Sequence, residues 1–219
     1  MKVGLAINSH KPRMEWLEQC LKTAKYFDNI FLYVQGVTDE QYKQIESWNI
    51  EKIYIERGIA EVGIVDGFNH VIRMMQTDWV CSFCDDDYFI EENTRELIDR
   101  IKSGAFANAD VIHFQVAVDN GGGWGEANVT EEGLREGNML PHGSFFRKKI
   151  FDELNGYKCE FGTDWEFWLR AIRNGVKFSY FEKPCYVFRV KNEGAYQRQL
   201  QEIGGIGKMR EAILKSAGV

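Results

Sequence analysis

The sequence predicts an α/β protein whose central sheet is mixed but mostly parallel and is flanked by helices. Short apolar runs alternate with segments of helical periodicity through the first half of the chain, which is typical of strands joined by crossover helices. One run, from Trp79 to Cys84, is almost continuously apolar, which suits a strand in the middle of a sheet covered on both faces. At 219 residues with 44% hydrophobic residues, the chain can bury one substantial core.

The first half is expected to contain strands that each lead into a helix. The strands are expected at residues 3–8, 30–34, 52–55 and 79–84, and the helices at about residues 16–24, 39–48, 61–75 and 91–103. In the last of these helices Leu97, Ile98 and Ile101 share one face, as expected for a helix that packs on a sheet.

The second half follows an apolar run at residues 111–118. Residues 120–125, with the sequence Asn-Gly-Gly-Gly-Trp-Gly, are not expected to be regular structure, because three consecutive glycines favour a mobile or tightly turned loop. Strands are expected at residues 144–147, 177–181 and 186–190, and helices at residues 149–154 and 164–174. We expect residues 1–190 to form a single domain, and residues 191–219 to form a tail that ends in a helix packed on the body or on a second copy of the chain, as in a homo-oligomer.

Charge and composition argue against several classes of protein. A net charge of −6 disfavours a protein that holds a nucleic-acid backbone, although a small phosphorylated ligand is compatible with it if a cation separates the like charges. No stretch approaches the roughly 20 apolar residues that span a bilayer, and residues 1–4 enter a strand without a signal-peptide pattern, so we expect a cytoplasmic protein. Cys81 and Cys84 point to opposite faces of a strand, which indicates buried thiols rather than a metal site.

The sharpest chemical feature is the acidic turn, Asp85-Asp86-Asp87, which directly follows the apolar strand. Ligands of open α/β sheets bind outside the carboxyl ends of such strands, and carboxylate oxygens suit Mg²⁺ or Mn²⁺. The alternative is a solvated turn that caps the next helix. Repulsion among three adjacent charges favours a bound cation.

A second feature is the helix that begins near Asp164. Trp165, Trp168 and Leu169 share one face of this helix, and Gly162 precedes it at a turn. Asp164 could act as an N-cap, or as a general base that takes the proton from an acceptor hydroxyl. Glu166 is the competing candidate for the base.

From Val3 to about Val190 the chain resembles the family 2 glycosyltransferases of the GT-A fold. The resemblance rests on the order and spacing of six fragments: Asn8-Ser9-His10-Lys11-Pro12 as the nucleotide loop, Asp85-Asp86-Asp87 as the Asp-x-Asp motif, Gly143-Ser144-Phe145-Phe146-Arg147, Asn155-Gly156-Tyr157, Phe161-Gly162-Thr163-Asp164 and Trp168-Leu169-Arg170. Each fragment is weak evidence alone, and their order makes the resemblance fairly specific.

The sequence departs from the family pattern at three places. Val34 and Gln35 stand where the second strand normally ends in two aspartates, one of which holds the nucleobase. In Gly67-Phe68-Asn69, Phe68 replaces an arginine expected near the diphosphate, and only Asn69 matches. Lys191 replaces a histidine, and either balances the charge of the diphosphate or is a solvated lysine.

The resemblance implies an inverting transfer of a sugar from a nucleoside diphosphate to a hydroxyl acceptor such as a glycan or glycolipid, with Mn²⁺ or Mg²⁺ as cofactor. It assigns the donor to residues 1–118 and the acceptor to residues 119–190. Asp85 and Asp87 would hold the metal, and Asp164 or Glu166 would be the base. The expected donor-binding residues are Asn8, Ser9, His10, Gln35, Asn69, Asp85, Asp86 and Lys191, and the expected acceptor or lid residues are Trp124, His142 and Trp165.

Two other functions stay open at this point. A nucleotidyltransferase could use a similar acidic pair, although residues 8–13 lack the glycines of a triphosphate-binding loop. A catalytically silent nucleotide-sugar-binding module would explain the missing aspartates and the missing arginine.

Overall fold

The structure is a computed structural model that describes residues 1–58, 61–190 and 195–219, and, for residues 195–197, only their helical backbone. Its main sheet has the strand order β10-β6-β9-β4-β1-β2-β3. The strands are β1 (Val3–His10), β2 (Asn29–Gln35), β3 (Ile53–Arg57), β4 (Trp79–Phe83), β6 (Val111–Phe114), β9 (Phe145–Arg147) and β10 (Phe178–Phe181). All pairs in this sheet are parallel except those that β9 makes with β4 and β6. The sheet is therefore mixed and mostly parallel, as the sequence predicted.

A smaller sheet has the order β5-β11-β7-β8, from β5 (Tyr88–Phe89), β11 (Tyr186–Phe188), β7 (Val116–Val118) and β8 (Gly123–Trp124). The sequence prediction for residues 120–125 was wrong at β8, because Gly123 and Trp124 pair with Ala117 and Val116. A Cβ on Gly123 would lie 2.4 Å from the Val116 carbonyl oxygen, so the missing side chain permits this pairing. The apolar run at residues 111–118 also divides at Gln115 into strands of different sheets.

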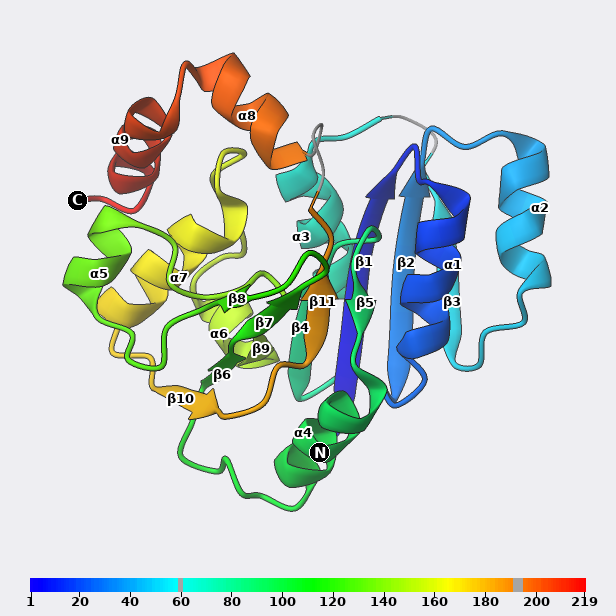
Figure 1. Cartoon of the computed structure of the whole chain (residues 1–219), viewed down its shortest axis with the longest axis horizontal. Coiled ribbons are helices and arrows are strands. Elements are labelled where there is room, and N and C mark those ends of the chain that lie inside the picture. Colours follow the sequence, from blue (N-terminus) through cyan, green and yellow to red (C-terminus); the bar gives the residue numbers. More distant parts are fainter. Residues whose placement is uncertain (59–60, 191–194) are drawn as a thin grey trace.

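The helices alternate with the strands and cover both faces of the main sheet (Figure 1). They are α1 (Met14–Thr23), α2 (Asp39–Ser47), α3 (Ile64–Met74), α4 (Glu91–Lys102), α5 (Glu131–Glu136), α6 (Lys148–Glu153), α7 (Thr163–Arg173), α8 (Ala195–Ile203) and α9 (Ile206–Ser216). Among the described residues, no helix combines the length and the apolar character that crossing a bilayer requires.

Alternating residues of the central strands point into two separate cores. Leu5, Cys81 and Phe145 pack with α1, α2, α4 and the smaller sheet on one face. Ala6 and Phe146 pack with α3, α5, α6, α7 and α9 on the other. Burial on both faces explains why Trp79–Phe83 is apolar at every position but one, Ser82, whose hydroxyl hydrogen-bonds the buried Tyr157 hydroxyl at 2.8 Å.

The parallel strands bring the predicted site residues to one edge. His10 is paired with Gln35 at the ends of β1 and β2, and Ile7 with Phe83 just before the acidic turn. The carboxyl ends of β1, β2 and β4 therefore meet, and the side chains that follow them gather at the place where ligands of open α/β sheets bind.

Candidate functional site

A cleft of about 400 Å³ lies at the carboxyl edge of the main sheet. Its walls come from β1 and the loop after it, from the start of α1, from the end of β2, from α3, from the acidic turn and from α8. The residues that form the walls are Asn8, His10, Lys11, Pro12, Arg13, Trp16, Gln35, Val62, Gly63, Ile64, Phe68, Cys84, Asp85, Asp86, Arg198 and Gln199. Of the residues assigned from the sequence to the donor, Asn8, His10, Gln35, Asp85 and Asp86 line this cleft.

One end of the cleft is an ordered pair of amides. The Gln35 side-chain nitrogen donates to Asn8 Oδ1 at 2.9 Å, and Gln35 Oε1 accepts the Val62 backbone N–H at 2.7 Å. The Asn8 nitrogen donates in turn to the Ile64 carbonyl at 3.4 Å. These bonds hold both amides in place, so the chain presents neutral amide groups where the resembling family has a carboxylate.

The acidic turn forms another part of the wall. Ser9 is fully buried, and its hydroxyl donates to Asp85 Oδ2 at 2.5 Å, which fixes one carboxylate from the neighbouring strand. Asp85 and Asp86 line the cleft. Asp87 lies behind them, 4% exposed, and accepts the Arg189 backbone N–H at 2.9 Å. Two carboxylates of the turn thus face the cleft and one supports it.

Burial raises the pKa of Asp87 to about 7. The negative charges of Asp85 and Asp119 act in the same direction, while the backbone N–H and the guanidinium of Arg189 oppose them. Burial therefore disfavours the ionised form of Asp87, and a cation beside it would favour that form.

Arg189 organises the acidic turn, and the sequence analysis assigned it no role. Its guanidinium donates to the Asp86 carbonyl and to the Gln19 side chain. It also lies over the rings of Trp16 and Tyr88, 5.1 and 4.6 Å from their centroids. Arg189 stands two residues before Lys191, which replaces a histidine of the family pattern, and this proximity was the signal in the sequence that could have found it.

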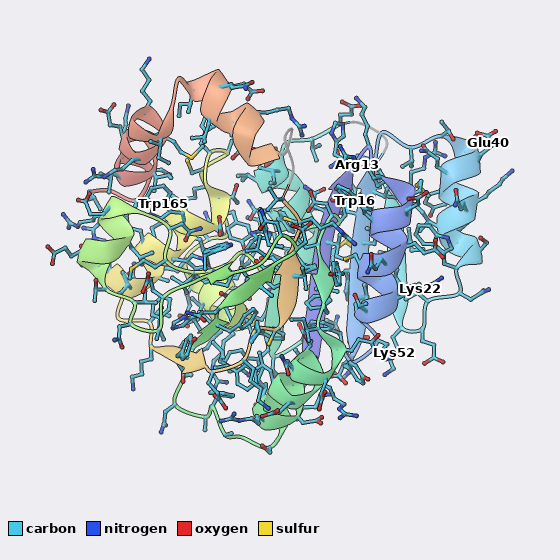
Figure 2. The ribbon with its side chains drawn as sticks, in the orientation of Figure 1. Arg13, Trp16, Lys22, Glu40, Lys52 and Trp165 are labelled. Carbon is cyan, nitrogen blue, oxygen red and sulfur yellow. The ribbon has the colours of Figure 1, made fainter. Side chains whose placement is uncertain are left out.

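The mouth of the cleft is basic. His10 and Lys11 both contact Glu61, at 3.2 and 2.9 Å, and the Arg13 guanidinium lies 4.3 Å from the centroid of Trp16. Figure 2 shows Arg13 and Trp16 together where α1 begins. Arg198 from α8 lines the same cleft. Lys191 lies outside the described residues.

Asp164 occupies the first turn of α7, whose N-cap is Gly162 in the left-handed conformation at φ 62°. Asp164 is therefore the second residue of the helix and not its N-cap. The Asn138 side-chain nitrogen donates to Asp164 Oδ2 at 2.9 Å. Asp164 does not line the cleft just described.

Two buried aromatic side chains respond to the charge of Asp164. Burial raises the pKa of Tyr186, and the negative charges of Asp87 and Asp164 act in the same direction. His142 lies with its ring edge toward Phe68 of the cleft wall, at 5.1 Å between centroids. Burial lowers the pKa of His142 while the Asp164 charge opposes that shift, and its Nε2 is shielded without a hydrogen-bond partner in the described part of the chain.

Several predicted site residues serve the structure instead. Glu166 is fully buried and forms a bidentate ion pair with Arg170, at 2.6 and 2.8 Å, which removes it as a candidate base. The Asn69 side-chain nitrogen donates to the Tyr157 carbonyl at 2.9 Å, and Asn69 Oδ1 accepts the Tyr157 backbone N–H at 2.8 Å. The buried Trp165 donates to the Leu134 carbonyl, beside α5 and away from Arg13 and Trp16 (Figure 2). Trp124 is half-buried against the core.

The two neighbouring thiols of the sequence also differ. Cys81 is buried and directs its thiol at the Gly143 carbonyl, 3.2 Å away, whereas Cys84 is half-buried and lines the cleft. In the described residues, no three His, Cys, Asp or Glu side chains converge as a ready-made metal cage. A cation here would share its coordination with water and a ligand, as Mg²⁺ usually does.

Comparison with known proteins extends this description. No protein-family model matches the sequence, and no curated protein matches it significantly. The structure of S. aureus TarS 1-349 in complex with UDP-GlcNAc is similar, with a TM-score of 0.73 and 14% identity, covering 90% of this chain and 61% of that chain. The same fragment in complex with UDP gives a TM-score of 0.70 at 16% identity, covering 87% and 61%.

A third similar structure is the mannosyltransferase PcManGT from Pyrobaculum calidifontis in complex with GDP-Man and Mn²⁺. It has a TM-score of 0.67 and 13% identity, covering 99% of this chain and 69% of that chain. The chain therefore spans about three fifths of the length of the TarS fragment. At these identities the likeness concerns the fold, and it confirms the fold class predicted from the sequence: the chain has the GT-A fold of glycosyltransferases.

Proposed function

We propose that this chain is a family 2 glycosyltransferase that moves a sugar from a nucleoside diphosphate to a hydroxyl acceptor. The observation that carries the proposal is the meeting of ordered amides, an acidic turn and a basic rim in one cleft at the carboxyl edge of a GT-A sheet. Similar structures hold UDP-GlcNAc, UDP, or GDP-Man with Mn²⁺, and these ligands support a nucleoside diphosphate sugar as the donor.

The donor occupies residues 1–118 in this proposal. The amides of Asn8 and Gln35 bind the nucleobase, because their hydrogen-bonding groups are already held in place. Asp85 on the cleft wall and Asp87 directly behind it would hold Mn²⁺ or Mg²⁺, which would neutralise charge on the departing diphosphate. The hard carboxylate oxygens of the turn fit such an ion.

The acceptor, a glycan or glycolipid hydroxyl, enters from residues 119–190. Asp164 takes the proton from the hydroxyl as its oxygen attacks the anomeric carbon, and the nucleoside diphosphate departs from the opposite face with inversion. Asn138 orients the Asp164 carboxylate through its hydrogen bond, leaving the other carboxylate oxygen to accept the proton. His142 and Tyr186 shield this region from water, which strengthens electrostatic interactions inside it.

A panel of nucleotide sugars tests the proposal directly. The panel includes UDP-GlcNAc and GDP-Man with Mn²⁺ or Mg²⁺, and release of nucleoside diphosphate is measured with and without hydroxyl acceptors. We expect release from at least one donor and its loss in the presence of a chelator. Binding of a donor with no hydrolysis or transfer across the panel would instead identify a silent binding module.

A further inference from the structure

The C-terminal segment returns to the cleft through α8. Arg198 and Gln199, both on α8, form part of the cleft wall together with Gly63 and Ile64 at the start of α3. Figure 1 shows the beginning of α8 beside α3, above the carboxyl ends of the central strands. A helix far along the chain therefore adds side chains to a site built mainly by the first half.

The contacts of α8 and α9 show how this placement is achieved. The α9 side chains Met209 and Ile213 are fully buried in the core around α7, which fixes that helix to the body. Gly204 and Gly205, at φ 86° and 107°, then reverse the chain between the two helices. Gln199 holds α8 in turn by donating to the Glu160 carbonyl at 2.8 Å.

The charges around the cleft indicate which group of a ligand Arg198 would contact. A bound diphosphate adds negative charge to a wall that already carries Asp85 and Asp86. Arg198 is an exposed guanidinium on the same cleft, and a guanidinium binds phosphate oxygens through two parallel N–H bonds.

We propose that α8 delivers Arg198 to the diphosphate of the donor, so that the C-terminal helix completes the donor site. Phe68, at the position where the resembling family has an arginine, lies in the wall of this cleft and offers only an aromatic surface. Arg198 supplies the missing positive charge from another element. The inference rests on the proposed function, since it requires the cleft to bind a nucleoside diphosphate.

Titration of the intact protein with UDP, GDP and inorganic pyrophosphate in Mg²⁺ tests the role of Arg198. We expect Arg198→Gln to lower the affinity for the nucleoside diphosphate that the wild type binds by about tenfold or more. The reason is that hydrogen bonds to charged groups contribute about 1.5–3 kcal/mol. Pyrophosphate, which has no base, should lose a similar factor. Arg198→Lys should recover part of the affinity, because lysine restores the positive charge but not the two parallel N–H donors of a guanidinium.

The matched control is Arg95→Gln on the surface of α4, where an arginine is lost away from the cleft. It should bind both probes as the wild type does, and the unliganded melting temperatures of all variants should agree. If Arg198→Gln binds the nucleoside diphosphate and pyrophosphate as tightly as the wild type, Arg198 has no such role and the proposed function stands. If the wild type binds neither UDP nor GDP, the proposed function itself fails, and this inference with it.

Discussion

Asp164 and Glu166 lie two residues apart on one helix, yet the structure gives them opposite surroundings. Glu166 is enclosed by Arg170, whose remaining N–H groups donate to the Leu154 and Gly156 carbonyls. Asp164 is half-buried and accepts a hydrogen bond from Asn138. One carboxylate is therefore committed to holding the fold, and the other is available for chemistry.

This difference predicts opposite effects of two isosteric substitutions. Asp164→Asn should lower kcat by about 10²–10⁴-fold with little change in stability, because it removes a base without removing volume. Glu166→Gln should leave kcat of the folded enzyme near the wild-type value while costing about 3 kcal/mol or more of unfolding free energy, because Arg170 loses its buried partner. Steady-state kinetics and chemical denaturation measure both. A kcat loss in Glu166→Gln alone would show that the assignment of Asp164 as the base is wrong.

At the residue scale, the sequence indicated groups at or just beyond the carboxyl ends of strands. Asn8, Gln35 and Asp85 could be placed in one site because parallel strands bring their carboxyl ends together. Arg198 could not, because it reaches the cleft from a helix whose position depends on tertiary packing. Asn69, Glu166 and Trp165 were assigned by resemblance or by proximity to a motif, and their hydrogen bonds hold other parts of the fold.

At the scale of elements, the close approach of α3 to β1 shapes the part of the cleft that contains the Asn8 amide. Gly67 faces the Asn8 amide, and a Cβ there would lie 2.3 Å from Asn8 Nδ2 and 2.5 Å from its Oδ1. The amide cannot move without losing its hydrogen bonds to Gln35 and Ile64. The absent side chain on α3 therefore sets the position of a side chain on β1.

Gly67→Ala should weaken nucleotide binding by about tenfold, as expected when one or two ordered hydrogen bonds are displaced. Alanine would otherwise favour the helix by about 1 kcal/mol, so any stability gain should be reduced or reversed by the displaced amide. Gly207→Ala in α9 is the matched control, since no atom lies within 4 Å of its added Cβ. Equal nucleotide affinity in both variants would show that Asn8 does not contact the nucleotide.

The predictability of an element follows from its length. Strand β4 and helices α1 and α4 carry enough periodic residues to be placed from the sequence within a few positions. The two-residue strands β5 and β8 and the six-residue α5 have no periodicity of their own. Their partners are distant in sequence, as where β5 pairs with β11, so only the assembled fold defines them.

At the scale of the whole molecule, one buried histidine links stability to pH. His113 on β6 is 1% exposed between Phe178 and Tyr180, and burial lowers its pKa to about 4, against a smaller opposing effect of the Glu126 backbone. The unfolded chain takes up the proton near the ordinary pKa of about 6.5, before the folded chain does. The contribution of neutral His113 is therefore present above pH 6.5 and lost as the pH falls toward 4.

His113→Phe should remove this part of the acid sensitivity. Between pH 7 and pH 4 the wild type should lose about 3 kcal/mol more unfolding free energy than the variant. This figure follows from a pKa difference of about 2.5 between the folded and unfolded chain, at about 1.36 kcal/mol per pKa unit. Urea denaturation at several pH values gives the difference. Because both proteins contain Asp87, its titration affects both curves equally and cancels in the difference. Parallel curves of unfolding free energy against pH for the two proteins would contradict the role given to His113.

The central claim is that one cleft binds a nucleoside diphosphate through a divalent cation held by the acidic turn. Thermal unfolding with UDP or GDP, each with Mn²⁺ and with a chelator, tests it most directly, because a ligand that binds only the folded state raises its apparent stability. We predict that stabilisation requires nucleotide and cation together and disappears in Asp87→Ala. Stabilisation that is absent in the wild type, independent of the cation, or unchanged in Asp87→Ala would contradict the claim.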